Sequence, residues 1–258
     1  MIGVNKKRPI GIFDSGLGGL TVVGELTKIL PNENLVYFGD TARIPYGTRS
    51  PETIRKFSLE NTNFLLSKKV KCVIIACNTS SAVASSFLKR KFPKVFIFEV
   101  ISSASREAKK AGKKIGVIGT RATIASGAYK AAKYQESCPL LVPFIEEGEL
   151  RNGALKIIIR EYLKPLKKAK IDTLILGCTH YPIIKNLIQK EMGKKVRLVN
   201  PEKTVAREVK QFLQKEEMLN PQKSKGRKDF YVTDLTSRFK TVAEMFLGHK
   251  IYAKLTKI

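Results

Sequence analysis

Two cysteines stand at matching places in this chain and could act as acid and base. Cys77 follows the apolar run 73–76, and Cys178 follows the apolar run 174–177, 101 positions further along. Each cysteine opens into a polar turn, so matching strand ends could bring the two thiols to opposite sides of a cleft. One thiol would take a proton from one face of a substrate while the other returns a proton to the opposite face. The pattern therefore predicts chemistry that inverts a stereocentre.

The surroundings of the cysteines separate reactive thiols from inert ones. Cys77 and Cys178 are expected at helix starts, where backbone N–H groups and the helix dipole lower the pKa of a thiol. Cys72 and Cys138 are expected to be inert small hydrophobes. Four cysteines in 258 residues are too few for a disulfide framework, and none forms a C-x-x-C pair. All four are therefore expected to be reduced.

A glycine-rich turn, residues 14–19, follows the first predicted strand. A dinucleotide fingerprint would need a glycine at position 21, where the chain has Thr21, although Asp40 lies about where a ribose-binding acid would. Free N–H groups in this turn, together with those after Asn78 and Thr179, could equally hold an amino-acid carboxylate.

The chain has two histidines, His180 and His249. The spacing of Cys178 and His180 could suggest a metal, but structural zinc needs four ligands and the sequence has no matching cluster, so no metal is expected. His180 is interpreted as an acid/base helper beside a thiol, with helix capping as the alternative.

Short β-branched runs alternate with longer amphipathic stretches, which predicts an α/β fold with mainly parallel sheets and crossover helices. Strands are expected over 9–13, 35–39, 71–76, 95–100, 114–118, 140–144, 171–176, 196–199 and 229–232. Helices are expected over 17–30, 51–68, 79–91, 102–111, 122–134, 148–167, 182–191, 202–217 and 236–247.

Similar strands recur at offsets of about 101 to 105 residues, which predicts two similar α/β lobes with the active site between them. Chance likeness of apolar strands followed by glycine is the alternative, and the cysteine pair argues against it. The first lobe is expected to comprise residues 1–95 plus 208–258, and the second residues 96–207. Residues 216–229, polar and rich in charge, form the expected linker before a closing strand and helix.

Composition narrows the class of protein. A hydrophobic content of 43% and a charged content of 27% are typical of a globular protein, and no apolar run approaches a membrane span. No signal peptide is recognised at the amino terminus, so a cytoplasmic location is expected. The formal charge of +26 favours anionic ligands. Because no recognition module is present, nucleic-acid contact is expected to be weak and salt-sensitive.

Taken together, these motifs resemble the glutamate racemases of the aspartate/glutamate racemase superfamily, nearly end to end. The matching segments are GIFDSGLGGLTV at 11–22, YFGDTARIPYG at 37–47, ACNTSSA at 76–82, LGCTHYP at 176–182, FYVTD at 230–234 and FLG at 246–248.

The resemblance implies a cofactor-independent interconversion of L- and D-glutamate, supplying D-glutamate for peptidoglycan, by an enzyme that is usually a homodimer. Cys77 and Cys178 would be the two bases, Asp14 would assist the first, and His180 and Glu146 would assist the second. The implied substrate contacts are Asp14, Ser15, Pro45, Tyr46, Gly47, Asn78, Thr79, Thr120, Thr179 and His180.

One segment departs from the family pattern: Asn200-Pro201 stands where an acidic residue and a small residue are usual. Two alternatives remain open from the sequence. The chain could racemise aspartate or another small acidic amino acid on the same scaffold. It could also be a basic nucleic-acid-binding or regulatory protein that retains the fold.

Overall fold

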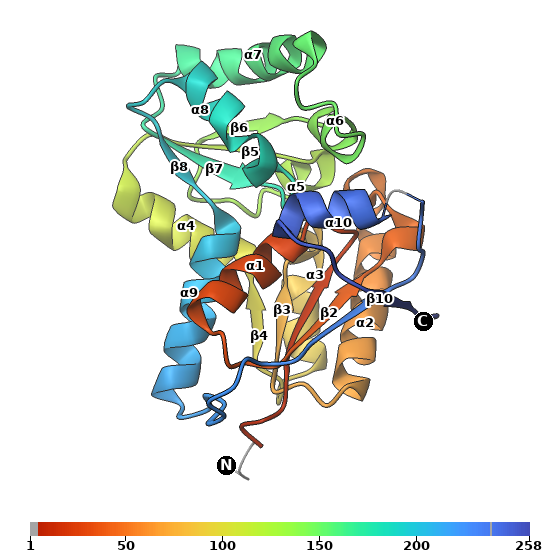
Figure 1. Cartoon of the computed structure of the whole chain (residues 1–258). Coiled ribbons are helices and arrows are strands. Elements are labelled where there is room, and N and C mark those ends of the chain that lie inside the picture. The colour runs from red at the N-terminus through yellow and green to blue at the C-terminus, as the bar shows by residue number, and fades with distance from the viewer. Residues whose placement is uncertain (1–4, 238) are drawn as a thin grey trace.

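The computed structural model describes residues 5–237 and 239–258, and two parallel β-sheets organise them (Figure 1). The first sheet has the strand order β10-β9-β2-β1-β3-β4, and every neighbouring pair is parallel. Its strands are β1 (Ile10–Asp14), β2 (Leu35–Gly39), β3 (Cys72–Ile75), β4 (Ile97–Glu99), β9 (Lys228–Val232) and β10 (Ala253–Leu255).

The second sheet has the order β6-β5-β7-β8 and is also parallel throughout. Its strands are β5 (Ile115–Gly119), β6 (Tyr134–Ser137), β7 (Thr173–Gly177) and β8 (Arg197–Val199). We call each sheet with the helices packed on it a lobe. The predicted α/β class with two parallel sheets is thus confirmed.

Helices connect the strands as crossovers, because parallel neighbours cannot be joined by tight turns. They are α1 (Leu20–Ile29), α2 (Pro51–Ser67), α3 (Asn78–Lys91), α4 (Val100–Ala111), α5 (Arg121–Ala125), α6 (Leu141–Glu146), α7 (Gly153–Lys168), α8 (Lys185–Met192), α9 (Pro201–Lys215) and α10 (Phe239–Leu247). Three short 3₁₀ segments are η1 (Thr41–Arg43), η2 (Tyr46–Thr48) and η3 (Tyr181–Ile184).

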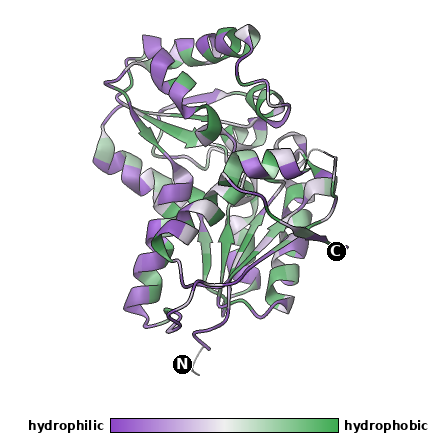
Figure 2. Cartoon of the chain, viewed as in Figure 1, coloured by the Kyte–Doolittle hydropathy of each residue, from purple (hydrophilic) through white to green (hydrophobic). Residues whose placement is uncertain are grey.

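The two lobes share apolar packing. One cluster of buried side chains runs from β1 through α1, α4 and α9 into β5 and β7 of the second lobe. A smaller cluster lies between the first sheet and helices α2 and α3. Central strands are buried on both faces, so they are mostly apolar, with Asp14 at the end of β1 and Thr173 at the start of β7 as exceptions, whereas the helices carry hydrophilic residues as well (Figure 2). This packing fixes the strand ends that carry the polar turns.

Local signals set several helix starts. Ser50 caps α2, since its hydroxyl accepts a hydrogen bond from Thr53 N at 3.2 Å, and Pro51 occupies the first helical position. Pro201 likewise begins α9. Asn200 precedes it without a side-chain capping bond, and its buried Oδ1 has no hydrogen-bond partner among the described residues.

Two predicted elements are wrong. Residues 140–144, expected as a strand, lie in and just before helix α6, because Leu141 and Ile145 face the core at helical spacing and Pro143 could not donate to a central strand. The strand of this region is instead β6, which is polar and half-buried. The helix expected over 122–134 ends at Ala125, and Gly127 turns the chain with φ of +63°.

The closing strand and helix that the sequence predicts are β9 and α10, and the edge strand β10 follows them without having been predicted. Within the described residues, no helix is both long and apolar enough to cross a membrane.

Candidate active site

A pocket of about 370 Å³ lies where the carboxyl ends of the strands of both lobes meet. Parallel sheets expose free backbone N–H groups and loop side chains at this edge, which is why ligands bind there. Of the thirteen residues that the sequence singles out for the site, twelve line the pocket: Ser15, Pro45, Tyr46, Gly47, Cys77, Asn78, Thr79, Thr120, Glu146, Cys178, Thr179 and His180. Asp14 is the thirteenth; it does not line the pocket and has no exposed surface.

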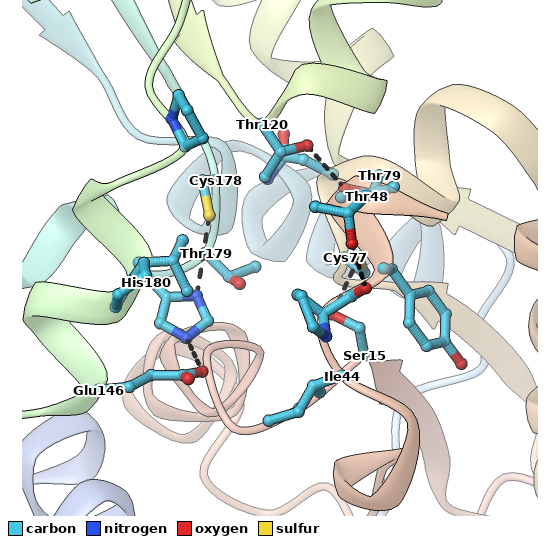
Figure 3. A pocket seen from close by; sticks show the side chains of 18 of the residues that line it. Ser15, Ile44, Thr48, Cys77, Thr79, Thr120, Glu146, Cys178, Thr179 and His180 are labelled. Atoms are coloured by element: carbon cyan, nitrogen blue, oxygen red, sulfur yellow. Dashed lines mark hydrogen bonds and ion pairs between the residues drawn. The ribbon is translucent and has the colours of Figure 1, made fainter. Parts of the chain in front are cut away.

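Cys77 and Cys178 lie on opposite sides of the pocket, with Ser15 beside the first and His180 beside the second (Figure 3). Cys77 follows β3 in the first lobe, and Cys178 follows β7 in the second. Both are nearly buried, with 5% and 6% of their surface exposed. The four cysteines are all free thiols, as predicted.

Cys77 is the N-cap residue of α3, and its thiol makes two hydrogen bonds. Its Sγ accepts from the backbone N–H of Ser80 at 3.5 Å and lies 3.4 Å from the hydroxyl of Ser15. The expected low pKa is nevertheless wrong for this thiol. Burial and the nearby charge of Asp14 raise the pKa of Cys77 to about 11, because removing a thiolate from water outweighs the stabilising hydrogen bonds.

Cys178 does not stand at a helix start, contrary to the sequence prediction. A turn and the 3₁₀ segment η3 follow it, and α8 begins only at Lys185. Its polar partner is instead a side chain: Cys178 Sγ lies 3.7 Å from His180 Nδ1. The two thiols therefore sit in different environments.

His180 links Cys178 to a carboxylate. Its Nε2 lies 2.9 Å from Glu146 Oε1, so the imidazole bridges thiol and carboxylate as Figure 3 shows. Burial alone would lower the pKa of His180, but its bonds to Cys178 and Glu146 outweigh burial and raise the pKa to about 10. Phe246 of α10 packs edge-on against the imidazole, with ring centroids 5.3 Å apart. The imidazole of His180 is therefore in contact with Cys178, Glu146 and Phe246.

Asp14 ends β1 directly below Ser15. Its Oδ2 accepts from the N–H of Gly16 at 3.0 Å, while its buried Oδ1 has no hydrogen-bond partner among the described residues. Burial raises the pKa of Asp14. Asp14 Oδ1 is therefore a hydrogen-bond acceptor without a donor, close to the thiol of Cys77.

The lobes are joined across the pocket by side-chain hydrogen bonds. Thr79 Oγ1 of the first lobe lies 3.0 Å from Thr120 Oγ1 and 3.3 Å from Thr123 Oγ1 of the second. Tyr129 OH of the second lobe donates to Asn78 Oδ1 at 2.6 Å, which leaves Asn78 Nδ2 buried without an acceptor. Asn78 itself lines the pocket, so this donor without a partner lies at the pocket's edge.

The glycine-rich turn 14–19 allows the chain to pack closely against neighbouring side chains. A Cβ on Gly18 would stand 2.3 Å from Thr179 Oγ1, and one on Gly19 would stand 2.5 Å from Asp14 Cβ. The first-lobe turn therefore lies directly against the second-lobe turn that carries His180.

Sequence reasoning missed several lining residues: Gly16, Ile44, Thr48, Arg121, Pro139, Val142, Pro143 and Glu147. Ile44 lies within the recognised segment 37–47, Thr48 follows that segment and Arg121 follows Thr120, so proximity to recognised residues could have indicated all three. Val142 and Pro143 were not recognised as site residues because residues 140–144 were predicted to form a strand. No group of three potential metal ligands occurs within residues 5–237 and 239–258.

The architecture and the site define a two-lobed α/β racemase. Residues 19–209 match the family model described as Asp/Glu/Hydantoin racemase. A glutamate racemase from Neisseria meningitidis serogroup A is 44% identical, over 96% of this chain and 96% of that protein. The chain therefore belongs to the glutamate racemases of this family, which are isomerases acting on amino acids.

Solved structures agree with this assignment. A glutamate racemase from Francisella tularensis, in complex with D-glutamate, superposes with a TM-score of 0.93 at 40% identity, covering 98% of both chains. A glutamate racemase isoform from Bacillus anthracis gives a TM-score of 0.94 at 36% identity, covering 98% of this chain and 99% of that one.

Proposed function

We propose that this pocket interconverts L- and D-glutamate without a cofactor, with Cys77 and Cys178 as the two bases. One observation carries the proposal: two nearly buried thiols, one from each lobe, line the same pocket from opposite sides. The D-glutamate complex of the Francisella tularensis relative supports glutamate as the ligand.

The proposed reaction moves two protons. The thiolate of one cysteine takes the α-proton, and the thiol of the other donates its proton to the opposite face of the same carbon. The product is the other enantiomer, and the two cysteines have exchanged protonation states. A thiolate and a thiol must therefore coexist, so the pair titrates as a unit.

The unequal surroundings of the thiols suggest unequal helpers. His180, with Glu146 behind it, is suited to hold the proton of Cys178, because its two nitrogens already face the thiol and the carboxylate. Asp14 is suited to assist Cys77, since its free Oδ1 can accept a hydrogen bond or a proton. Each thiol then has its own preferred enantiomer.

Removing an α-proton beside a carboxylate builds up negative charge, which needs donors aimed at the substrate in advance. The free Nδ2 of Asn78 is one such donor. The hydroxyls of Ser15, Thr79, Thr120 and Thr179 and the backbone N–H groups of the same strand-end turns are the proposed others. The near-complete burial of both thiols limits competition from water.

The sequence assigns residues 1–95 with 208–258 to the first lobe and 96–207 to the second, and we propose this division with one change. Strand β4 pairs with β3 in the first sheet, so the second lobe begins after Glu99. D-glutamate made here would supply peptidoglycan synthesis. The homodimer, the weak nucleic-acid contact and the cytoplasmic location expected from the sequence stay predictions.

The decisive experiment follows α-proton exchange and racemisation of each glutamate enantiomer in deuterated water. Cys77→Ala and Cys178→Ala should each abolish racemisation. Cys72→Ala is the matched control, because Cys72 begins the strand β3 that precedes Cys77 but does not line the pocket. Wild-type turnover in either pocket variant would disprove the two-base assignment.

The same assay with D-aspartate tests the substrate. Because aspartate is shorter by one methylene, a pocket suited to glutamate should favour glutamate by about 10-fold or more in kcat/KM. Equal kcat/KM values for both amino acids would show that the substrates are acidic amino acids in general and not glutamate in particular.

A further inference from the structure

A buried carboxylate beneath the pocket gathers hydrogen bonds from three separate side chains. Asp40 follows β2 and has no exposed surface. Its Oδ1 accepts from the hydroxyl of Thr233 at 3.0 Å, and its Oδ2 accepts from Arg43 Nε at 2.7 Å and from the hydroxyl of Tyr46. Its own N–H donates to the carbonyl of Asp14 at 3.1 Å. Asp40 therefore ties β1 to the loop that follows β2.

That loop forms one wall of the pocket. Residues 44–48, which we call the pocket wall, all line the cavity. Tyr46 is 1% exposed, and its hydroxyl donates to Asp40 and accepts from Asn61 Nδ2 at 3.1 Å. The hydroxyl thus anchors the wall from below. Gly47 lies against the other lobe, since a Cβ there would stand 2.8 Å from Thr120 Cβ.

Helix α2 holds the same loop from its outer side. Arg43 pairs with Glu60 and places its guanidinium 4.0 Å above the ring of Phe57. The charge of Arg43 balances the carboxylate of Asp40, which a buried acid requires.

The third support comes from the far end of the chain. Thr233 directly follows β9, and its hydroxyl donates to Asp40 while accepting from the N–H of Ala42 at 2.9 Å. Beside it, Thr41 Oγ1 donates to the carbonyl of Asp234 at 2.6 Å and accepts from the N–H of Asp234 at 2.8 Å. Residues separated by about 190 positions are thus joined under the pocket wall.

We propose that Asp40 and Thr233 are positioning residues for substrate binding, which hold the pocket wall in register with the strand ends that carry the cysteines. The inference rests on the proposed function. The pocket wall contains neither of the two cysteines. Displacing it should therefore weaken the binding of substrate and of transition state equally. Loss of such uniform binding raises KM and leaves kcat unchanged.

Thr233→Val tests the inference, because valine keeps the shape and removes the hydroxyl. We expect KM for both glutamate enantiomers to rise about tenfold, equivalent to about 1.4 kcal/mol, with kcat within about twofold of wild type. Thr233→Ser should restore KM, since serine supplies the same donor. Asp40→Asn removes the shared acceptor charge and should raise KM further.

Thr62→Val is the matched control. Thr62 is buried in α2, and its hydroxyl donates to the carbonyl of Ser58 at 2.7 Å, away from the pocket wall. Loss of the Thr62 hydroxyl should lower the free energy of unfolding without changing KM. A wild-type KM in Thr233→Val, or an equal KM change in Thr62→Val, overturns the inference.

Calorimetric titration with D-glutamate separates this inference from the proposed function. A wild-type chain that does not exchange the α-proton of glutamate contradicts the proposed function. The inference fails separately when wild type and Thr233→Val bind D-glutamate with the same affinity.

Discussion

Gly18 of the first lobe lies directly against Thr179 of the second, so that a Cβ on Gly18 would stand 2.3 Å from Thr179 Oγ1 and 2.8 Å from His180 Nδ1. Both second-lobe side chains are 6% exposed and line the pocket. This contact relates the two lobes at the point where the second thiol and its imidazole are held.

Gly18→Ala should therefore displace the turn that carries His180. A shift of about 1 Å in reacting groups can reduce rate about 100-fold, and we expect a loss of that order in kcat/KM. Gly24→Ala, within α1, is the control, because its nearest atom would be Leu247 Cδ2 at an ordinary 3.7 Å. Racemisation and thermal unfolding of both variants provide the comparison; unchanged turnover in Gly18→Ala would contradict the prediction.

The thiol of Cys77 should react slowly near neutral pH. Burial first, and then the charge of Asp14, raise the pKa of Cys77 to about 11. Because the thiolate is the nucleophile, alkylation of Cys77 by iodoacetamide should accelerate as pH rises toward 11. Ser15→Ala removes a stabilising hydrogen bond and should move the profile to higher pH. Site-resolved mass spectrometry measures the rate, and a plateau below pH 8 would refute the raised pKa.

Tyr129 should matter for binding although it lies outside the lining of the pocket. Tyr129→Phe leaves the Oδ1 of Asn78 buried without its donor, which destabilises such a group by about 1–3 kcal/mol and frees the amide to rotate. We expect KM to rise about tenfold, with a matching loss of stability. Tyr134→Phe is the control, because Tyr134 does not line the pocket and the change keeps the ring that Lys133 Nζ approaches at 5.9 Å from the centroid. Equal KM values in the two variants would argue against the prediction.

Glu202, buried at the start of α9, should make stability depend on pH. Burial, followed by the charge of Glu25, raises the pKa of Glu202 to about 7. Because the pKa of an unfolded glutamate is about 4.3, the stability it contributes is full below that pH and is lost as pH rises through 7. Glu202→Gln should exceed wild type by about 1–3 kcal/mol at pH 8 and by less at pH 5.

Chemical denaturation at several pH values measures the Glu202 effect. Glu208→Gln removes another carboxylate from α9, one paired with Arg106 near the surface, and provides the control. A constant difference between Glu202→Gln and wild type across this pH range would contradict the prediction.

Most of the fold could be predicted from sequence because buried parallel strands are apolar on both faces. The exceptions follow from the same rule. Strand β6 is a half-buried edge strand with the polar sequence Tyr134–Ser137, so it lacks an apolar pattern. Strand β10, with two of its three residues exposed, lacks one as well.

Residues of the site could be predicted where they follow recognisable strands, as Cys77 and Cys178 do. The pKa values of the site residues could not be predicted, because they depend on burial, and burial depends on the packing of both lobes. The helix start at Cys77 predicted a lowered pKa, but desolvation reversed its direction. Contacts between distant segments, such as that of Tyr129 with Asn78 or Thr233 with Asp40, have no local signature at all.

The position of β9 between β2 and β10 has a consequence for the order of events during synthesis. Residues 1–99 are synthesised before the second sheet, whereas β9 and Thr233 are synthesised after it. The second sheet, built wholly from residues 115–199, can pair while the first still lacks two strands. Every residue that lines the pocket lies within 15–180, so the lining is synthesised before Thr233, and Asp40 gains its hydrogen bond from β9 only afterwards.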